Sequence, residues 1–552
     1  MSTNAQVAKQ LLEIADMLDL LGEKFKPEAY RRAARSIESL GEDLRRVKAK
    51  GGLDQIPGVG EAISGKIAQF LTEGKIDYLE KLRRQFPPGL LDLMQLPGIG
   101  PKTARRFWVE LGIEGPAELI QAIDSGRLQG VRGFGERKIA LFRAAAAPKS
   151  GPVGRMPLRT AHEVMARLLE GLRARAPVDR VHPAGSLRRS RESVGDLDIV
   201  ATSTKAAAVF DAFAALPGIQ SVSLRGDTKM TVFVAPGIQV DLRVVEPEAF
   251  GAALQYFTGS KEHNIHLRTI ARDRGLKVNE YGVWKGEERV AGASEEEVYG
   301  ALGLDWMPPE IRENRGEIEA AQAHSLPKLI ERSALHGDLH AHLSAHPDAG
   351  EVGRWISAAQ AAGLRYLGLI LPRADLEVPS DRWGTSLPSP AGDLLEVRFG
   401  IELPAAEAPV ARPGGAVDFW VATGPARRAS SPPQNVPPPL FASHLGLASE
   451  GSETDPALLR GWIDLARDWG SALEIAPGGA ADGLDSTGVR QAVEAPVPLA
   501  LSAGAHQPEE LSDIAIALGI ARRGWLTAPG VLNAQPSFPG RRREASRRAR
   551  SG

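Results

Sequence analysis

The sequence predicts a multidomain protein of the α+β class, and three observations carry that prediction. A glycine-containing turn pattern recurs between helical apolar periodicities in the first 145 residues. Strand-like alternation, with carboxylates inside it, appears between residues 193 and 244. Further strand-like segments that carry histidine or acidic residues recur after residue 335. A chain of 552 residues is long enough for about three or four domains of usual size.

The composition excludes several kinds of site. The chain has no cysteine, which excludes disulfides, thiolate zinc sites and cysteine nucleophiles. No apolar run reaches the roughly 20 residues that cross a bilayer, and the first residues lack a signal-peptide pattern. We therefore expect a cytoplasmic protein with no membrane partner.

Charge is unevenly distributed along the chain. Residues 1–150 hold 24 Lys and Arg against 19 Asp and Glu, whereas residues 336–535 hold 13 Arg, no Lys and 23 acidic residues. A basic tail follows at residues 541–550. Blocks of opposite sign indicate modules that meet different partners. The tail fits either a phosphate-binding arm or a plain solvated end.

The helical first third contains an internal repeat. Residues 56–67 and 96–107 share a hydrophobic-Pro-Gly-hydrophobic-Gly turn followed by a helix, and residues 131–139 form a looser third copy. The glycines permit a tight turn, and the next helix begins with free N–H groups that bind one backbone phosphate without reading sequence. One copy alone would be read as a helix connector; three favour DNA binding. The candidate DNA-contacting residues here are Gly58, Gly60, Lys66, Gly98, Gly100 and Lys102.

The segment 185–198 combines an anion cradle with a metal site. Its glycines, small hydroxyl residues and arginines offer N–H groups and guanidinium forks to phosphate oxygens. Asp196 and Asp198 follow at i and i+2, so in a strand both carboxylates project together while Leu197 turns toward the core. Hard oxygen ligands beside bound phosphates suit Mg²⁺. The segment is typical of a nucleotidyltransferase.

A third carboxylate is available on a predicted hairpin. Asp241 lies in the alternating segment 238–244, whose partner would be residues 229–234 across the turn 235–237. Alone, Asp241 would be read as a solvent-facing strand residue. If these strands neighbour that of Asp198, the carboxylates meet and form a two-metal site, which activates an attacking oxygen and stabilises departing pyrophosphate.

At this point the chain resembles DNA polymerase family X, the group that includes DNA polymerase beta, and specifically its bacterial branch. The resemblance covers nearly the whole length and includes the segments 185–200, 256–260 and 279–282. It implies a palm site that binds two Mg²⁺ or Mn²⁺ ions through Asp196, Asp198 and Asp241, of which Asp241 activates the primer terminus. It further implies triphosphate contacts from Gly185, Ser186, Arg189 and Gly195, nucleotide contacts from Tyr256, Phe257 and Gly259, a base-edge contact from Asn264 and a template contact from Arg268.

Lys66 falls where the polymerase beta group places a Schiff-base lysine that removes a 5′-deoxyribose phosphate. Ala62 replaces a basic residue that lyase-active members carry. Both a lyase role and a plain phosphate contact for Lys66 stay open.

The last part of the chain resembles a PHP (polymerase and histidinol phosphatase) domain, a distorted β/α barrel with a trinuclear metal site. His340 and His342, at i and i+2, point to one strand face. The further candidate ligands for Mn²⁺ or Zn²⁺ are Asp348, Glu402, His444 and His506, on later strand-like segments.

This part also departs from the family pattern. Leu371-Pro372-Arg373 stands where Thr-Asp-His is expected, Thr423-Gly424 where a histidine is expected, and Gly504 where an aspartate is expected. These losses favour a domain that keeps one or two metals with residual phosphoesterase activity, or a remnant serving structure or DNA positioning, over an intact nuclease.

The predicted function is a DNA-directed DNA polymerase that fills short gaps during repair, with accessory 3′–5′ exonuclease activity as an open addition. Its expected partners are gapped or nicked double-stranded DNA, dNTPs, and DNA ligase or other repair proteins, at the nucleoid. The alternatives are a non-catalytic DNA-end-binding scaffold, a primarily metal-dependent nuclease, and a nucleotidyltransferase acting on RNA or small molecules. The expected domains are 1–86 and 87–150 (helix-hairpin-helix), 151–250 (palm), 251–316 (thumb-like), 317–334 (linker), 335–535 (PHP-like) and 536–552 (basic tail).

Overall fold

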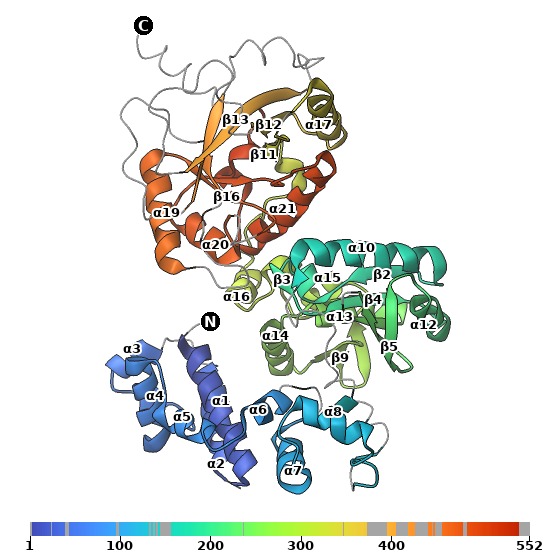
Figure 1. Ribbon diagram of the computed structural model, residues 1–552, viewed down its shortest axis with the longest axis vertical. Helices are drawn as coiled ribbons and strands as arrows, with labels where there is room; N and C mark the ends of the chain where they lie inside the picture. The colour runs from blue at the N-terminus through green and yellow to red at the C-terminus, as the bar shows by residue number, and fades with distance from the viewer. Residues whose placement is uncertain are drawn as a thin grey trace. The chain divides into compact units, whose positions relative to one another are not determined.

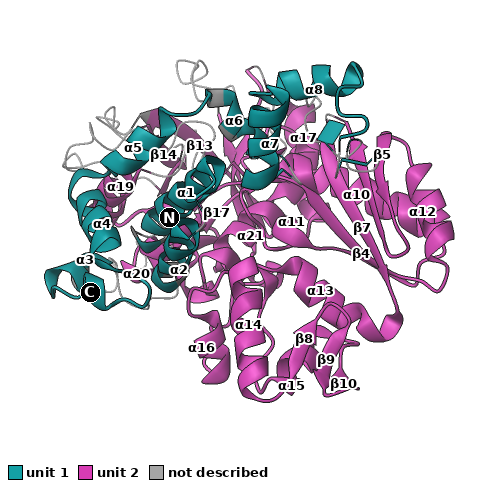
Figure 2. Ribbon diagram, turned by 90° about the horizontal axis from the view of Figure 1, so that it is seen from below, with its two compact units in different colours: residues 1–150 teal, residues 151–552 magenta. Residues whose placement is uncertain are grey.

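The computed structural model divides the chain into two compact units, Met1–Ser150 and Gly151–Gly552 (Figure 2). Several predicted features lie outside the described residues: Gly98, His444, Pro372-Arg373, residues 132–133 and 136–138 of the third turn copy, and residues 540–552 of the basic tail. None of the described helices is long and apolar enough to cross a membrane. The structure describes residues 3–23, 25–38, 44–94, 96, 99–131, 134–135, 139, 142–143, 156–235, 237–345, 347–371, 395–404, 418–424, 440–443, 445, 447, 455–478 and 483–539.

The first unit is helical (Figure 1), because apolar residues recur at helical spacing along each segment. In the first helix Leu11, Ile14 and Leu18 are buried in a shared core, whereas Leu21 is exposed at its end. The described helices are α1 (Thr3–Leu21), α2 (Lys26–Glu38), α3 (Leu44–Ala49), η1 (Leu53–Gln55), α4 (Glu61–Glu73), α5 (Asp77–Arg83), α6 (Pro88–Met94), α7 (Pro101–Leu111) and α8 (Pro116–Asp124).

The second unit begins with the palm, a five-stranded sheet in the order β2-β4-β7-β6-β5. Strand β4 alternates between two buried faces: Leu197 and Ile199 join the large core, and Val200 joins a small cluster with Phe250. The palm strands are β2 (Arg180–Pro183), β4 (Leu197–Thr202), β5 (Ile219–Arg225), β6 (Lys229–Val234) and β7 (Ile238–Val245). The neighbouring elements are β1 (Met156–Pro157), α10 (Leu158–Arg175), α11 (Gly185–Arg188), β3 (Ser193–Val194), α12 (Ala206–Ala214), η2 (Pro247–Ala249) and α13 (Phe250–Thr258).

A smaller core lies in the thumb-like region. Within the segment expected as a linker, 317–334, α16 (Glu317–Gln322) buries Ile318 and Ala321 in this core. The apolar side chains three residues apart make one helical face, so this core includes residues beyond 316. Its other elements are α14 (Lys261–Asp273), β8 (Lys277–Asn279), β9 (Gly282–Lys285), β10 (Glu288–Ala291), α15 (Glu295–Ala301) and η3 (Pro309–Ile311).

The last region is a parallel barrel of seven described strands in sequential order, β11 to β17. A bridge between Ala341 and Ala505 links the first strand to the segment after the last, so the barrel is nearly closed. Its strands are β11 (Gly337–His342), β12 (Tyr366–Ile370), β13 (Glu396–Pro404), β14 (Phe419–Thr423), β15 (Phe441–Ala442), β16 (Ala472–Ile475) and β17 (Leu499–Leu501). Its helices are η4 (Arg332–Ala334), α17 (Ala349–Ala361), α19 (Pro456–Trp469), α20 (Ser486–Glu494), η9 (Pro508–Asp513), α21 (Ile514–Arg523), η10 (Ala528–Gly530) and η11 (Leu532–Ala534).

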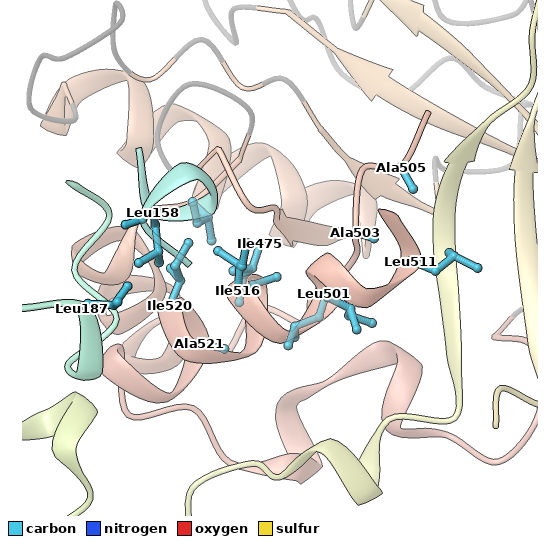
Figure 3. Close-up of a cluster of buried hydrophobic side chains, with 14 of the residues drawn as sticks. Leu158, Leu187, Ile475, Leu501, Ala503, Ala505, Leu511, Ile516, Ile520 and Ala521 are labelled. Atoms are coloured by element: carbon cyan, nitrogen blue, oxygen red, sulfur yellow. The ribbon is translucent and has the colours of Figure 1, made fainter. Parts of the chain in front are cut away.

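One hydrophobic core runs from the palm into the barrel without a break. Figure 3 shows Leu158 and Leu187, from α10 and α11, beside Ile520 of α21. Ile516 of the same barrel helix belongs to this cluster. Although the sequence predicts the palm and the barrel as separate domains, the two belong to one compact unit.

Candidate active site

The three expected catalytic carboxylates meet at one end of the palm sheet. β4 and β7 pair in parallel with Asp198 opposite Asp241, and Asp196 directly precedes β4. Leu197 between the two aspartates is fully buried in the palm core. The aspartates therefore face away from that core, as strand alternation requires.

The site is rich in negative charge. Burial, together with the charges of Asp196 and Asp241, raises the pKa of Asp198 to about 7. Lys229 lies 2.6 Å from Asp241 Oδ2, and the Thr231 hydroxyl donates to Oδ1 at 2.6 Å. Such a set of oxygen donors, held at mutual electrostatic cost, fits hard divalent cations such as Mg²⁺ or Mn²⁺.

The expected phosphate loop wraps around the Asp198 carboxylate. Gly185 has φ +64°, and a Cβ there would lie 2.3 Å from Asp198 Oδ2, so only glycine permits this approach. The Ala184 N–H donates to the Asp198 carbonyl at 2.8 Å. Ser186 is half-buried and Gly195 is exposed, at opposite ends of the loop. The chain thus brings its anion cradle and its carboxylates together.

Arg189, the expected triphosphate ligand, is buried in a network of protein contacts. Its Nε donates to Glu313 Oε1 at 2.7 Å, and its Nη1 donates to the Thr258 carbonyl. Although burial raises the pKa of Glu313, the charges of Arg523 and Arg189 outweigh it and lower that pKa to about 2. Sequence reasoning missed Glu313 and Arg523, which read as surface charges.

A second buried ion cluster supports the same loop. Arg188 and Arg312 each contact Glu295 through two guanidinium nitrogens, at 2.6–3.0 Å. Arg312 is fully buried. Sequence reasoning missed this cluster too, because Ser294 before an acidic helix start is the ordinary signature of a helix N-terminus.

The expected sugar-edge aromatics end helix α13. The Tyr256 and Phe257 rings meet edge-to-face at 5.1 Å between centroids. Arg243, two residues after Asp241 on β7, lies 4.4 Å from the Phe257 ring centroid. Gly259 has φ +71° and comes close to Arg189 Nη1, which would lie 3.2 Å from a Cβ at that position. These contacts tie the aromatic pair to both the catalytic strand and the phosphate loop.

The expected base-edge and template residues share helix α14. Asn264 is largely buried; its Nδ2 donates to the Tyr256 carbonyl at 2.7 Å, and its Oδ1 accepts from Gln255 at 2.8 Å. Arg268 is exposed one turn later and donates to the Asn264 carbonyl at 3.3 Å. Two hydrogen bonds hold the Asn264 amide in one orientation, whereas the Arg268 side chain is exposed to solvent.

The repeated turns of the first unit have matching geometry. In the first two copies, a turn hydrogen bond joins Val59 N to Ile56 O and Ile99 N to Leu96 O, and the third copy has the equivalent bond from Phe134 N. Gly60 and Gly100 are the N-caps of α4 and α7, and neither helix has a side-chain cap. Gly58 has φ +84°, and Lys102 is exposed in the first turn of α7.

Lys66 lies on α4 against two aromatic rings. Its Nζ is 4.8 Å from the Tyr78 ring centroid and 5.9 Å from that of Tyr30, and it donates to the Ala62 carbonyl at 2.9 Å. Burial lowers its pKa. Three other basic residues of the first unit form ion pairs: Lys26 with Glu23, Arg31 with Asp16 and Asp19, and Lys75 with Asp77.

The barrel brings His340, His342 and Glu402 together. One ligand atom from each of these residues lies within 4.8 Å of the others, which suits a metal ion with mixed nitrogen and oxygen ligands. Glu474 Oε1 lies 2.7 Å from His340 Nδ1, and the His506 ring stacks on His342 at 4.3 Å. Burial lowers the pKa of His340, but Glu474 and Glu402 outweigh it and raise that pKa to about 10.

Other expected barrel ligands are placed differently. The expectation that Asp348 lies on a strand-like segment is wrong: it is the N-cap of α17, where its Oδ1 accepts from Glu351 N at 2.7 Å. Gly504 has φ +55°, and no described atom lies within 4 Å of a Cβ built there. It lines a cavity of about 250 Å³ together with His340, His342, Glu474 and His506.

Comparison with known proteins finds family models and relatives that match the chain. The DNA polymerase beta thumb model matches residues 253–313, a helix-hairpin-helix domain model matches residues 2–76, and a SAM-like helix-hairpin-helix tandem model matches residues 90–141. The chain is similar to DNA polymerase lambda of Rattus norvegicus, with 24% identity over 56% of each chain. It is also similar to DNA-directed DNA/RNA polymerase mu of Homo sapiens, with 24% identity over 56% of this chain and 69% of the human one.

The fold and the palm site thus define the class, family X DNA polymerases. Within that class, the chain is 32% identical to the DNA polymerase/3′-5′ exonuclease PolX of Bacillus subtilis, over 95% of this chain and 96% of the bacterial protein. The chain belongs to the bacterial PolX family. The predicted fold class and family are confirmed.

Proposed function

We propose that this chain fills short gaps in double-stranded DNA during repair by adding dNTPs to a primer end. The observation that carries the proposal is the cross-strand pairing of Asp198 with Asp241, with Asp196 adjacent and Gly185 against the Asp198 carboxylate. A carboxylate cluster beside an anion-binding loop is what nucleotidyl transfer needs, because the reaction depends mainly on positioning and charge stabilisation.

The roles of the palm residues follow from this geometry. Asp196 and Asp198 would hold both ions, and Asp241 would face the primer terminus. Two divalent cations, when bound, supply the positive charge that lowers the pKa of the primer hydroxyl and offsets the charge of departing pyrophosphate. Ser186, Arg189 and the Gly195 backbone would hold the triphosphate.

The residues around the palm carboxylates would bind the nucleotide and the template strand. Tyr256 and Phe257 would contact the sugar. Asn264, which two hydrogen bonds hold in one orientation, would contact the base edge. Arg268, which is exposed, would contact the template strand.

The helix-hairpin-helix turns would grip the DNA backbone. The uncapped helix starts at Gly60 and Gly100 offer N–H groups to phosphates, and this contact requires no base sequence. The substrate would be nicked or gapped DNA, with DNA ligase or other repair proteins as further partners, at the nucleoid in the cytoplasm.

The test is primer extension on one-nucleotide-gapped DNA with Mg²⁺ or Mn²⁺. We expect the wild type to add one nucleotide, the Asp196→Asn/Asp198→Asn double variant to lose addition, and DNA affinity to change little between them. A His340→Ala/His342→Ala variant serves as the control that alters a different cluster. Extension that survives the double aspartate change would refute the site, and no extension by the wild type would favour a DNA-end-binding scaffold.

A second activity is supported by the barrel cluster. His340, His342 and Glu402 form a group that would hold one Mn²⁺ or Zn²⁺ ion, and the similar Bacillus subtilis protein is named as a 3′-5′ exonuclease. Expected ligands are replaced at Gly504, at Thr423-Gly424 and in the segment 371–373. We therefore propose a barrel that binds fewer than three metal ions and has a weak 3′–5′ exonuclease activity. Primer shortening that disappears in His340→Ala/His342→Ala would support it, and its absence from the wild type would refute it.

A lyase activity of the first unit is supported by the setting of Lys66. A lysine nucleophile needs a neutral amine, and partial burial lowers the pKa of Lys66, whose Nζ lies over the rings of Tyr78 and Tyr30. We propose that Lys66 attacks the aldehyde of a 5′-deoxyribose phosphate at a gap.

A further inference from the structure

A barrel helix, α21, packs directly on the phosphate loop of the palm. Ile516 and Ile520 of this helix share a core with Leu187 of the loop (Figure 3). Gly519 lies so close to Ser190 that a Cβ would be 2.3 Å from the serine Oγ. Only glycine at position 519 therefore permits the helix to approach the loop this closely.

The same helix ends in Arg523, which contacts Arg189, the residue proposed to bind the triphosphate. Arg523 Nη1 donates to Glu313 Oε1 at 2.7 Å and to the Arg189 carbonyl at 3.1 Å. Arg189 Nε donates to the same oxygen of Glu313, also at 2.7 Å. One half-buried carboxylate therefore serves two guanidinium groups, one from the palm and one from the barrel.

This sharing has an electrostatic consequence for nucleotide binding. Glu313 engages Arg189 Nε, and the Thr258 carbonyl engages Nη1, so a triphosphate that draws the guanidinium toward itself weakens the Arg189–Glu313 bond. If Arg189 were the sole partner of Glu313, its departure would leave a half-buried carboxylate without a cation, which is costly, and the incoming negative phosphates would add repulsion. Arg523 removes this cost because it stays with Glu313 while Arg189 turns to the phosphate.

We infer that Arg523, supplied by the barrel, is a positioning residue for nucleotide binding: it holds Glu313 so that Arg189 is released to the triphosphate. The inference rests on the proposed polymerase function. It gives the barrel a role in the palm reaction that does not depend on barrel metals.

The experiment compares KM for the nucleotide and kcat on gapped DNA for wild type and Arg523→Met. We expect KM to rise about tenfold and kcat to change less than about threefold, because the change affects ground-state binding. Arg522→Met is the matched control: it removes an ion pair of the same length, 2.7 Å to Glu310, from the same helix but away from the loop. It should keep the wild-type KM.

A rescue variant separates positioning from simple loss of packing. Glu313→Gln removes the charge that Arg523 neutralises, so Arg523→Met/Glu313→Gln should return KM to near the wild-type value, and Arg523→Lys should recover part of it. A KM unchanged in Arg523→Met, or raised and not rescued by Glu313→Gln, would overturn the inference.

Equilibrium titration with a fluorescent dNTP and Mg²⁺ keeps the two proposals distinguishable. If the wild type does not extend primers but binds the nucleotide, the polymerase proposal fails while the affinities of the same variants still test Arg523. If the wild type neither extends nor binds, both fail.

Discussion

Asp198 and Asp241 are direct cross-strand neighbours in the parallel pair β4–β7. Adjacent strands lie about 4.8 Å apart, so two carboxylates at paired positions repel one another unless a cation lies between or beside them. Lys229 partly fills that role for Asp241, at 2.6 Å. The catalytic end of the sheet is therefore held in place by the fold although it opposes folding electrostatically.

The first prediction concerns stability and pH without metal. The pKa of Asp198, about 7 in the folded protein, exceeds the value of about 4 expected in an unfolded chain. The folded state thus binds this proton more tightly, and the free energy of unfolding falls as pH rises from about 4 to about 7. We expect Asp198→Asn to stabilise the metal-free protein at pH 8 by about 1–3 kcal/mol.

Thermal unfolding of EDTA-treated protein at pH 5 and pH 8 measures this effect. Asp227→Asn, at an exposed turn, is the control and should leave the pH dependence unchanged. Equal pH dependence in wild type and Asp198→Asn would contradict the prediction, and added Mg²⁺ should raise the midpoint of the wild type more than that of the variant.

The second prediction concerns the buried cluster behind the phosphate loop. Glu295→Gln leaves Arg188 and the fully buried Arg312 without their carboxylate, which we expect to destabilise the second unit by about 3 kcal/mol or more. Chemical denaturation followed by tryptophan fluorescence measures it. Glu296→Gln, the exposed neighbour, should change stability by less than about 0.5 kcal/mol, and a similar loss in both variants would refute the cluster's role.

The third prediction restores a barrel ligand. Gly504 has open space at its Cβ position and lies in the cavity with His342 and His506, so Gly504→Asp should add a carboxylate there. We expect Mn²⁺ affinity, measured by calorimetry, to rise about tenfold. Gly363→Asp is matched, with positive φ and open surroundings but no place in that cavity, and should have no effect. An unchanged affinity in Gly504→Asp would show that the missing aspartate does not limit metal binding.

The fourth prediction tests Lys66 as a nucleophile. Borohydride should trap a covalent adduct between the wild-type protein and DNA bearing a 5′-deoxyribose phosphate, because a Schiff base is reducible. Lys66→Ala should lose the adduct, whereas Lys102→Ala should keep it and only weaken DNA binding. Adduct formation that persists in Lys66→Ala would assign the chemistry to another amine.

Much of this arrangement could be predicted from local sequence. The alternation around Asp198 and Asp241 places both on strands, and the repeated turns predict helix starts with free N–H groups, because both signals depend on residues close in the chain. The contact between Arg523 and Glu313 joins residues 210 positions apart and has no local signal. Arg312 likewise reads as a surface charge, since arginine is rarely fully buried.

The expected linker shows a second limit. A short helix such as α16 is predicted poorly because its stability comes from the core that Ile318 and Ala321 enter, and not from its own sequence. The N-cap role of Asp348 is hard to predict for a different reason. An aspartate serves both helix capping and metal binding, so its residue type does not decide between them.

The uninterrupted core between palm and barrel makes the palm depend structurally on the barrel. Cutting the chain before residue 335 would uncover Leu158 and Leu187 and leave the phosphate loop without its support. Changes confined to His340 or His342 leave this packing intact, whereas any side chain at Gly519 meets Ser190 Oγ at 2.3 Å. The helix at the barrel's edge is therefore part of the structural support of the palm.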